Sequence, residues 1–139
     1  MEAIAAFSLA CNILQVAEFG CKAASTFSQV YKNHTTDENY DIDTRTRHLS
    51  KALAQLDDSL RSQHNIEDAG LLQLSHQCAT VAKSLNDKLA PFLHKPSRHR
   101  DRWRNGLKAL RIKGEVENLA SRLRKYQQTL DTKILIDLR

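Results

Sequence analysis

The sequence predicts an all-α protein, a bundle of four long helices and one short helix with mostly antiparallel neighbours. Apolar residues recur at steps of three and four along most of the chain, which is the helical period. The 139 residues contain only 4 Gly and 2 Pro, so few positions break a helix. No segment alternates apolar and polar residues as a half-buried strand does. The short connections favour antiparallel neighbours, and residues 1–139 are expected to form one domain.

The first predicted helix, Ala3 to Lys32, is the element around which the chain is organised. It carries no charge between Glu2 and Glu18. Its polar residues follow one another at steps of three or four and form one narrow stripe: Ser8, Asn12, Gln15, Glu18, Lys22, Ser25, Gln29 and Lys32. Apolar residues cover most of the remaining circumference, including Ile4, Phe7, Cys11, Leu14, Val16, Phe19, Ala23, Phe27 and Val30. Such a helix is expected to be buried among others, inserted in lipid, or able to exchange between these states.

The second and third predicted helices each carry a single apolar seam. The second spans about Asn39 to Gln63, with the seam Ile42, Thr46, Leu49, Leu53, Leu56 and Leu60. The third follows a connection at His64–Gly70, with the seam Leu71, Leu74, Cys78, Val81, Leu85, Leu89 and Phe92. Pro96 must terminate the third helix, and Pro91 predicts a kink or an early end near Leu89.

The last part of the chain predicts one short and one long helix. Ser97 is a candidate N-cap for a short helix over Arg98 to Ile112, which Gly114 is expected to interrupt. A final helix then begins at Glu115, with the seam Val116, Leu119, Leu123, Tyr126, Leu130 and Ile134. The apolar ending ILIDL leads us to expect further protein after Arg139.

Cysteine usage and the N-terminus indicate a cytoplasmic protein. Cys11, Cys21 and Cys78 are odd in number and lie within apolar helical patterns, so we expect buried free thiols in a reducing compartment. The N-terminus has Glu2 where a signal peptide carries basic residues. Polar residues also interrupt the roughly 20 apolar residues that a membrane-spanning helix requires.

The sequence contains no motif that points to catalysis. It lacks a glycine-rich phosphate loop, G-x-S-x-G, H-E-x-x-H and a paired cysteine motif. The six histidines are dispersed and form no ligand spacing. We therefore expect no enzyme activity, no catalytic residues, no metal and no cofactor.

One cluster of basic residues stands out between positions 95 and 113. We call the basic cluster Arg98, Arg100, Arg102, Arg104, Lys108 and Arg111; Lys95 and Lys113 flank it, Trp103 lies in its middle, and Asp101 is its one acid. Arginines around an aromatic suit a phosphate-rich surface, either lipid headgroups or nucleic acid. A solvated helix face with Trp103 turned into the core is the alternative. Arg122, Arg124 and Lys125 are candidates to extend the cluster. No nucleic-acid-binding motif accompanies it, so we expect no nucleic-acid partner.

The opening of the chain resembles the N-terminal domains of fungal STAND proteins, which are relatives of NOD-like receptors. These domains carry N-[IV]-[IL]-Q-[FV]-[VIA]-[DE]-[FY]-[GA], which is matched here by Asn12, Ile13, Leu14, Gln15, Val16, Ala17, Glu18, Phe19 and Gly20. Gln77 to Leu89 resembles the family's C-x-x-[LV]-A-x-x-L helix. The run from Trp103 to Leu110, followed by Glu115 to Leu138, resembles its W-x-x-[FL]-x-x-A-[LV] helix and long final helix.

The resemblance implies a HeLo-like bundle that acts as the cell-death effector domain of a fungal receptor. Its expected partners are further copies of itself, a nucleotide-binding domain that follows in the same chain, and anionic lipids of the plasma membrane. The candidate membrane-insertion residues are Ile4, Phe7, Cys11, Leu14, Glu18 and Phe19. The basic cluster is the candidate anionic-lipid patch. The residues leave open a helical protein-interaction module that never touches lipid, and a nucleic-acid binder that uses the arginines.

Overall fold

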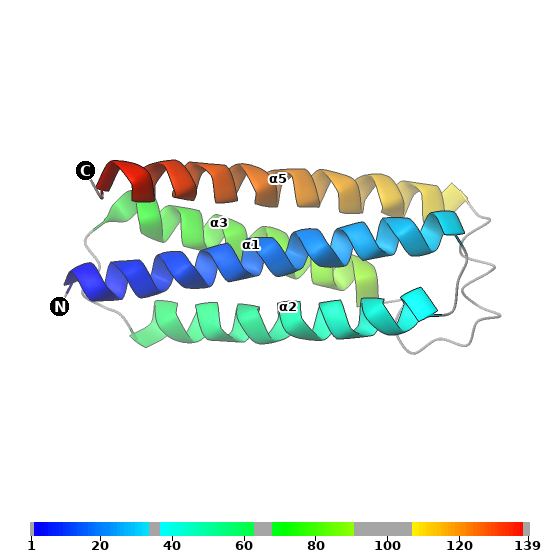
Figure 1. The fold of residues 1–139 in the computed structure, drawn as a ribbon, viewed down its shortest axis with the longest axis horizontal. Helices are drawn as coiled ribbons and strands as arrows, with labels where there is room; N and C mark the ends of the chain where they lie inside the picture. The colour runs from blue at the N-terminus through cyan, green and yellow to red at the C-terminus, as the bar shows by residue number, and fades with distance from the viewer. Residues whose placement is uncertain (1, 34–36, 63–67, 91–106, 138–139) are drawn as a thin grey trace.

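The computed structural model describes residues 2–33, 37–62, 68–90 and 107–137, and these form an all-helical bundle (Figure 1). The helices are α1 (Glu2–Asn33), α2 (Asp37–Ser62), α3 (Ala69–Leu89) and α5 (Leu107–Asp137). The described residues contain no strand. The predicted all-α bundle is therefore confirmed for the part of the chain that the structure describes.

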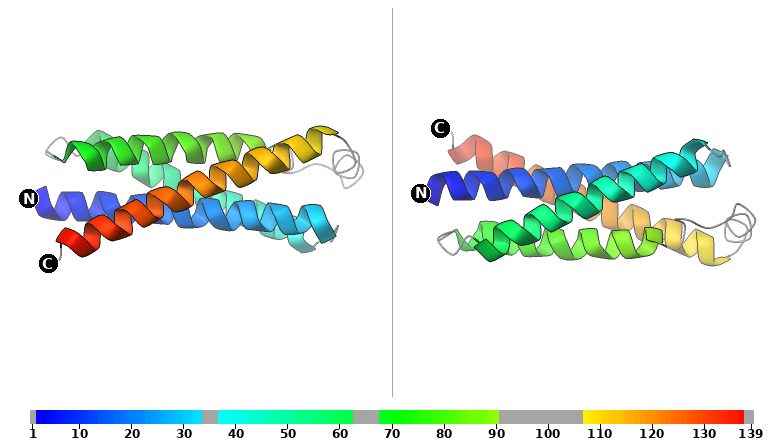
Figure 2. Two further views of the ribbon diagram at one scale, coloured as in Figure 1. Left: turned by 90° about the horizontal axis from the view of Figure 1, so that it is seen from above. Right: turned by 90° about the horizontal axis from the view of Figure 1, so that it is seen from below.

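Helix α1 occupies the central position. It packs against α2, α3 and α5, so every other described helix contacts it. The beginning of α1, the end of α2, the beginning of α3 and the end of α5 lie at one end of the bundle (Figures 1 and 2). We call this end the N-terminal end. The start of α5 lies at the opposite end, next to the end of α3 (Figure 2).

The core consists of the four helical faces that turn toward one another. From α1 it takes Leu9, Ala10, Ile13, Val16, Ala17, Ala23, Ala24 and Phe27. The predicted seams supply Thr46, Leu49, Leu53, Leu56, Leu71, Leu74, Cys78, Val81, Leu85, Leu89, Val116, Leu123 and Leu130, all buried. Leu60, Leu119 and Tyr126 are partly buried and pack against this core. The side chains of Ile42 and Ile134 lie outside the described residues. The helical period thus identified the inward faces of α2, α3 and α5.

The helix boundaries follow the local chemistry of the chain. Helix α1 ends at Asn33, one residue beyond the predicted Lys32, and α3 ends at Leu89, as Pro91 predicted. Helix α3 begins after Asp68, whose carboxylate accepts a hydrogen bond from the backbone N–H of Leu71 at 3.1 Å. That bond satisfies one of the amides that the first turn of a helix leaves without a partner.

The predicted interruption at Gly114 is wrong, because α5 runs without a break from Leu107 to Asp137. A glycine in an exposed helix interior costs only about 1 kcal/mol relative to alanine. Ile112 and Val116 lie on either side of Gly114 and are both buried, and their burial outweighs that cost. Ser97 and residues 98–106 of the predicted short helix lie outside the described residues.

The prediction of three buried thiols is also wrong for Cys11 and holds only in part for Cys21. All three cysteines are free, but only Cys78 is buried, whereas Cys21 is half-buried and Cys11 is exposed. Cys11 lies seven residues before Glu18 and therefore shares the exposed face of α1 with it. The apolar residues around each cysteine in the sequence therefore did not indicate whether its thiol lies in the core or on the exposed face of a helix.

Candidate functional site

The beginning of α1 presents an apolar surface to solvent. Phe7 is 61% exposed and is the one large hydrophobic side chain so exposed among the described residues. Cys11 follows one turn later and is exposed, and Leu14 follows after another turn and is half-buried against the core. We call these three residues the N-terminal apolar edge. They belong to the predicted membrane-insertion set, and the structure brings them together on one face.

Glu18 and Phe19, the remaining described members of that set, do not extend the apolar edge. The carboxylate of Glu18 is exposed and pairs with the Lys22 ammonium group at 2.9 Å, one turn further along α1. Phe19 turns toward α2, where its ring lies 5.6 Å from the ring of His48. Charged and polar residues thus replace apolar ones on the outward face from Glu18 onward. The side chain of Ile4 lies outside the described residues.

The inward side of α1 is tied to the other helices by packing and by polar contacts. The Asn12 amide donates to the Ser59 hydroxyl of α2 at 2.6 Å. The thiol of Cys78 in α3 lies 3.9 Å from the carbonyl oxygen of Ile13. Burial raises the pKa of Cys78 to about 12, so this thiol stays protonated and is no nucleophile.

The second half of α1 is held against α5 in a similar way. The thiol of Cys21 lies 3.7 Å from the carbonyl oxygen of Ala120. Burial also raises the pKa of the Cys21 thiol, and the neighbouring Arg124 guanidinium partly offsets that effect. Arg124 therefore turns to the α1 side of α5. It was a candidate to extend the basic cluster, and the structure places it beside a helix interface instead.

The structure describes the basic cluster only in part. Arg98, Arg100, Arg102 and Arg104 lie outside the described residues, as does the side chain of Lys108. The Arg111 side chain is 81% exposed, and its Nε lies 3.6 Å from the Glu115 carboxylate. Lys88 of α3 reaches the same carboxylate at 2.8 Å, and its hydrogen bond, assisted by Arg111, lowers the pKa of Glu115.

The N-terminal apolar edge and the described part of the basic cluster lie at opposite ends of the bundle (Figure 1). Helix α1 has 32 residues and spans on the order of 50 Å at 1.5 Å per residue. The apolar edge is near its start, whereas Arg111 is in the second turn of α5, at the other end of the bundle. A bundle standing upright on a membrane therefore presents one of these surfaces and not the other.

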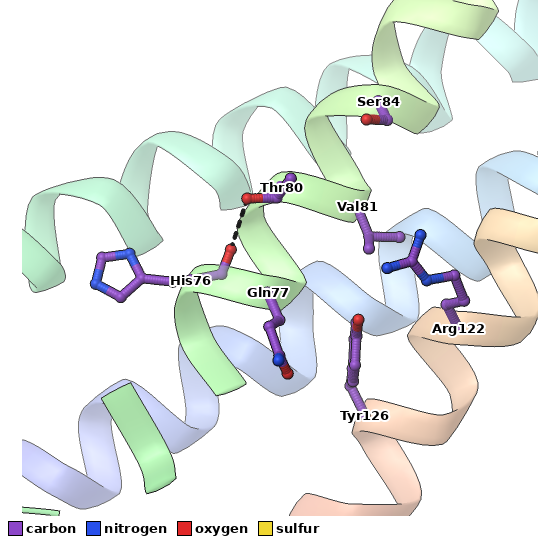
Figure 3. A pocket seen from close by; sticks show the side chains of 7 residues that line it. All are labelled: His76, Gln77, Thr80, Val81, Ser84, Arg122 and Tyr126. Atoms are coloured by element: carbon purple, nitrogen blue, oxygen red, sulfur yellow. Dashed lines mark hydrogen bonds between the residues drawn. The ribbon is translucent and has the colours of Figure 1, made fainter. Parts of the chain in front are cut away.

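A groove between α3 and α5 is a feature that the sequence analysis missed. It is a depression of about 270 Å³, which we call the α3–α5 groove, lined by His76, Gln77, Thr80, Val81, Ser84, Arg122 and Tyr126 (Figure 3). Arg122 and Tyr126 are one turn apart on α5 and face α3. One partial signal was the prediction that Arg122 could extend the basic cluster. The helical period places His76, Thr80 and Ser84 on one face of α3, and Arg122 and Tyr126 on one face of α5, but it does not indicate that these two faces meet.

The remaining chemistry of the described residues is sparse. No group of three or more His, Cys, Asp or Glu side chains in these residues could hold a metal ion. Among the helices that the structure describes, none combines the length and apolarity needed to cross a membrane. No family model matches the chain, and neither the curated proteins nor the solved structures include a significant match to it.

Proposed function

We propose that the protein is a cell-death effector domain of a fungal NOD-like receptor, which oligomerises and perturbs the plasma membrane through the start of α1. The observation that supports this most is the N-terminal apolar edge. Phe7 is exposed near the beginning of a helix that carries no charge between Glu2 and Glu18. An exposed aromatic on such a segment suits burial at the boundary between headgroups and acyl chains.

The resting bundle limits how α1 can act. Leu9, Ile13, Val16 and Phe27 are essentially fully buried, and exposing them to water would cost roughly 6–12 kcal/mol. That is as large as the whole stability of an ordinary domain, about 5–15 kcal/mol. Release of α1 from a monomer in water is therefore too costly. Insertion of α1 therefore has to be coupled to contact with lipid. It also requires other copies of the domain, which cover the apolar faces of α2, α3 and α5 that α1 leaves behind.

In this proposal the first contact is made by the N-terminal apolar edge alone. The edge belongs to the N-terminal end of the bundle, where the beginnings of α1 and α3 and the ends of α2 and α5 also lie (Figure 1). Oligomerisation, driven by a following nucleotide-binding domain, then concentrates many such edges on one cytoplasmic membrane surface. Arg111, the described member of the basic cluster, lies at the opposite end of the bundle, so binding of anionic lipid through it, at about 1 kcal/mol per basic residue, is a separate contact from the one that the apolar edge makes.

A helical protein-interaction module is the second candidate. It is favoured by the central packing of α1, which contacts all three other described helices and holds the bundle together. An exposed Phe7 can bind the surface of another protein as well as a bilayer. In neither candidate does the chain act as an enzyme.

Leakage from lipid vesicles separates the two candidates. The domain would be prepared as a monomer and as a fusion to a domain of known oligomeric state, then added to dye-filled vesicles containing phosphatidylserine. The effector proposal expects the oligomer to release dye and the monomer to release little. An oligomer that binds a partner protein but leaves such vesicles intact would support the interaction module.

A further inference from the structure

The α3–α5 groove lies between two ion pairs that join these helices. Near the N-terminal end, Lys133 of α5 pairs with Asp68 before α3. Near the other end, Lys88 of α3 pairs with Glu115 of α5. Between them the groove holds Arg122, and no carboxylate is among its lining residues. The structure gives Arg122 no ion pair within the described part of the chain.

Two of the lining groups on α5 turn toward α3 and are hydrogen-bond donors. In Figure 3 the Arg122 guanidinium and the Tyr126 hydroxyl point from α5 toward α3, and the Gln77 side chain of α3 lies beside Tyr126. Val81 of α3 contributes an apolar side chain to the lining. The Thr80 hydroxyl already donates to the carbonyl of His76 at 2.9 Å, and the His76 ring points away from the groove. A guanidinium, a phenol and an amide therefore remain for a ligand.

We propose that the α3–α5 groove binds a phosphate monoester group. A phosphate offers several acceptor oxygens and negative charge, and the fork of an arginine side chain matches two of those oxygens. Tyr126 and Gln77 each supply a further donor. The volume of about 270 Å³ is slightly below that of a pocket for a drug-sized molecule, so it suits a phosphate and the first atoms of its carrier. The phosphate site is independent of membrane insertion by α1.

Nuclear magnetic resonance titration tests this site directly. The probes are inorganic phosphate and glycerol 3-phosphate in solution, and vesicles of phosphatidylcholine with and without phosphatidic acid, whose headgroup is a phosphate monoester. The variant is Arg122→Gln. Its control is Arg124→Gln, which removes the same charge from the same helix but on the side that faces Cys21 of α1. Both arginines are exposed, so both variants should fold, which circular dichroism would confirm.

The proposal expects saturable shifts of the Arg122, Tyr126 and Gln77 signals in the wild-type domain and in Arg124→Gln. Arg122→Gln should weaken the affinity about tenfold or more, and Tyr126→Phe should weaken it less. If only the soluble phosphates bind, the phosphate group that the groove recognises belongs to a free metabolite. If phosphatidic acid vesicles bind as well, it belongs to a lipid headgroup. Unsaturable shifts spread over all basic residues, or equal affinities of the two arginine variants, would overturn the proposal.

Discussion

Gly20 of α1 lies directly against Leu123 of α5, so that a β-carbon at position 20 would collide with the leucine side chain. The same β-carbon would lie 3.5 Å from Leu85 of α3 and 3.8 Å from Leu49 of α2. Position 20 is therefore the point where α1 meets all three of the other described helices. The glycine allows a close approach that a side chain would prevent.

Gly20→Ala should lower the free energy of unfolding by about 1–3 kcal/mol, because the added methyl group overpacks this contact. Alanine is the better helix former by about 1 kcal/mol. The measured loss of stability is therefore the cost of overpacking minus this gain in helix propensity. Chemical denaturation with a constant m-value would measure it.

Gly114→Ala is the matched control for that substitution. Gly114 also lies inside a helix, but a β-carbon there would meet no atom within 4 Å. This variant should be more stable than the wild type by up to about 1 kcal/mol. Equal effects of the two substitutions would mean that α1 and α5 do not touch at Gly20.

The two glycines also show what the sequence could and could not predict. The sequence predicted that Gly114 interrupts a helix, yet Gly114 and Gly20 both lie within continuous helices. The effect of a glycine depends on what its missing side chain would touch, and that is a property of the neighbouring helix. By contrast, Leu56 and Leu85 were predicted to be buried from the helical period alone, and both are fully buried.

The candidate site was predictable only in part for a similar reason. The first helix is apolar around most of its circumference, so the period could not decide which apolar residues face outward. Packing against three helices buries Leu9 and Ile13 and leaves Phe7 exposed. The α3–α5 groove was not predictable, because Arg122 and Gln77 are far apart in the chain and meet only when the two helices pack.

Acid should destabilise the bundle in part through Asp68. The hydrogen bond from Lys133, followed by that from the Leu71 amide, lowers the pKa of the Asp68 carboxyl. A folded-state pKa below the unfolded value of about 3.9 means that Asp68 stabilises the fold above that pH and loses this contribution as the pH falls through the folded pKa.

Asp68→Asn keeps an N-cap but removes the charge. At pH 7 this variant should be less stable than the wild type, and the difference should shrink as the pH is lowered below about 4. Thermal unfolding at several pH values would measure both curves. A difference that is unchanged down to pH 2 would show that the carboxylate charge contributes nothing.

The three thiols should differ sharply in reactivity. Cys11 is exposed and should react with a thiol reagent such as Ellman's reagent within the time of mixing at pH 8. Cys78 is buried with a pKa of about 12, so it should react only when the protein unfolds. Counting modified thiols over time, with Cys11→Ser as the control, tests this. Rapid modification of both thiols that remain in Cys11→Ser, Cys21 and Cys78, would contradict the packing of α1 against α3 and α5.

The central claim, that the N-terminal apolar edge carries the effector activity, can be tested with one charge placed at two positions. Phe7→Glu puts a carboxylate on the edge, and Gln15→Glu puts the same group on an exposed position of the same helix two turns further on. Neither side chain is in the core, so both variants should fold. Deleting residues 1–9 is a less clean test, because it also removes the fully buried Leu9.

The decisive measurement is the rate of dye release from phosphatidylserine vesicles by oligomer fusions of the wild type, Phe7→Glu and Gln15→Glu. Full burial of a phenylalanine side chain stabilises the bound state by about 1.5–3 kcal/mol. The proposal therefore predicts that Phe7→Glu releases dye about tenfold or more slowly than the wild type. Gln15→Glu should release dye nearly as fast as the wild type. Equal release by Phe7→Glu and Gln15→Glu, with both variants folded, would contradict the claim.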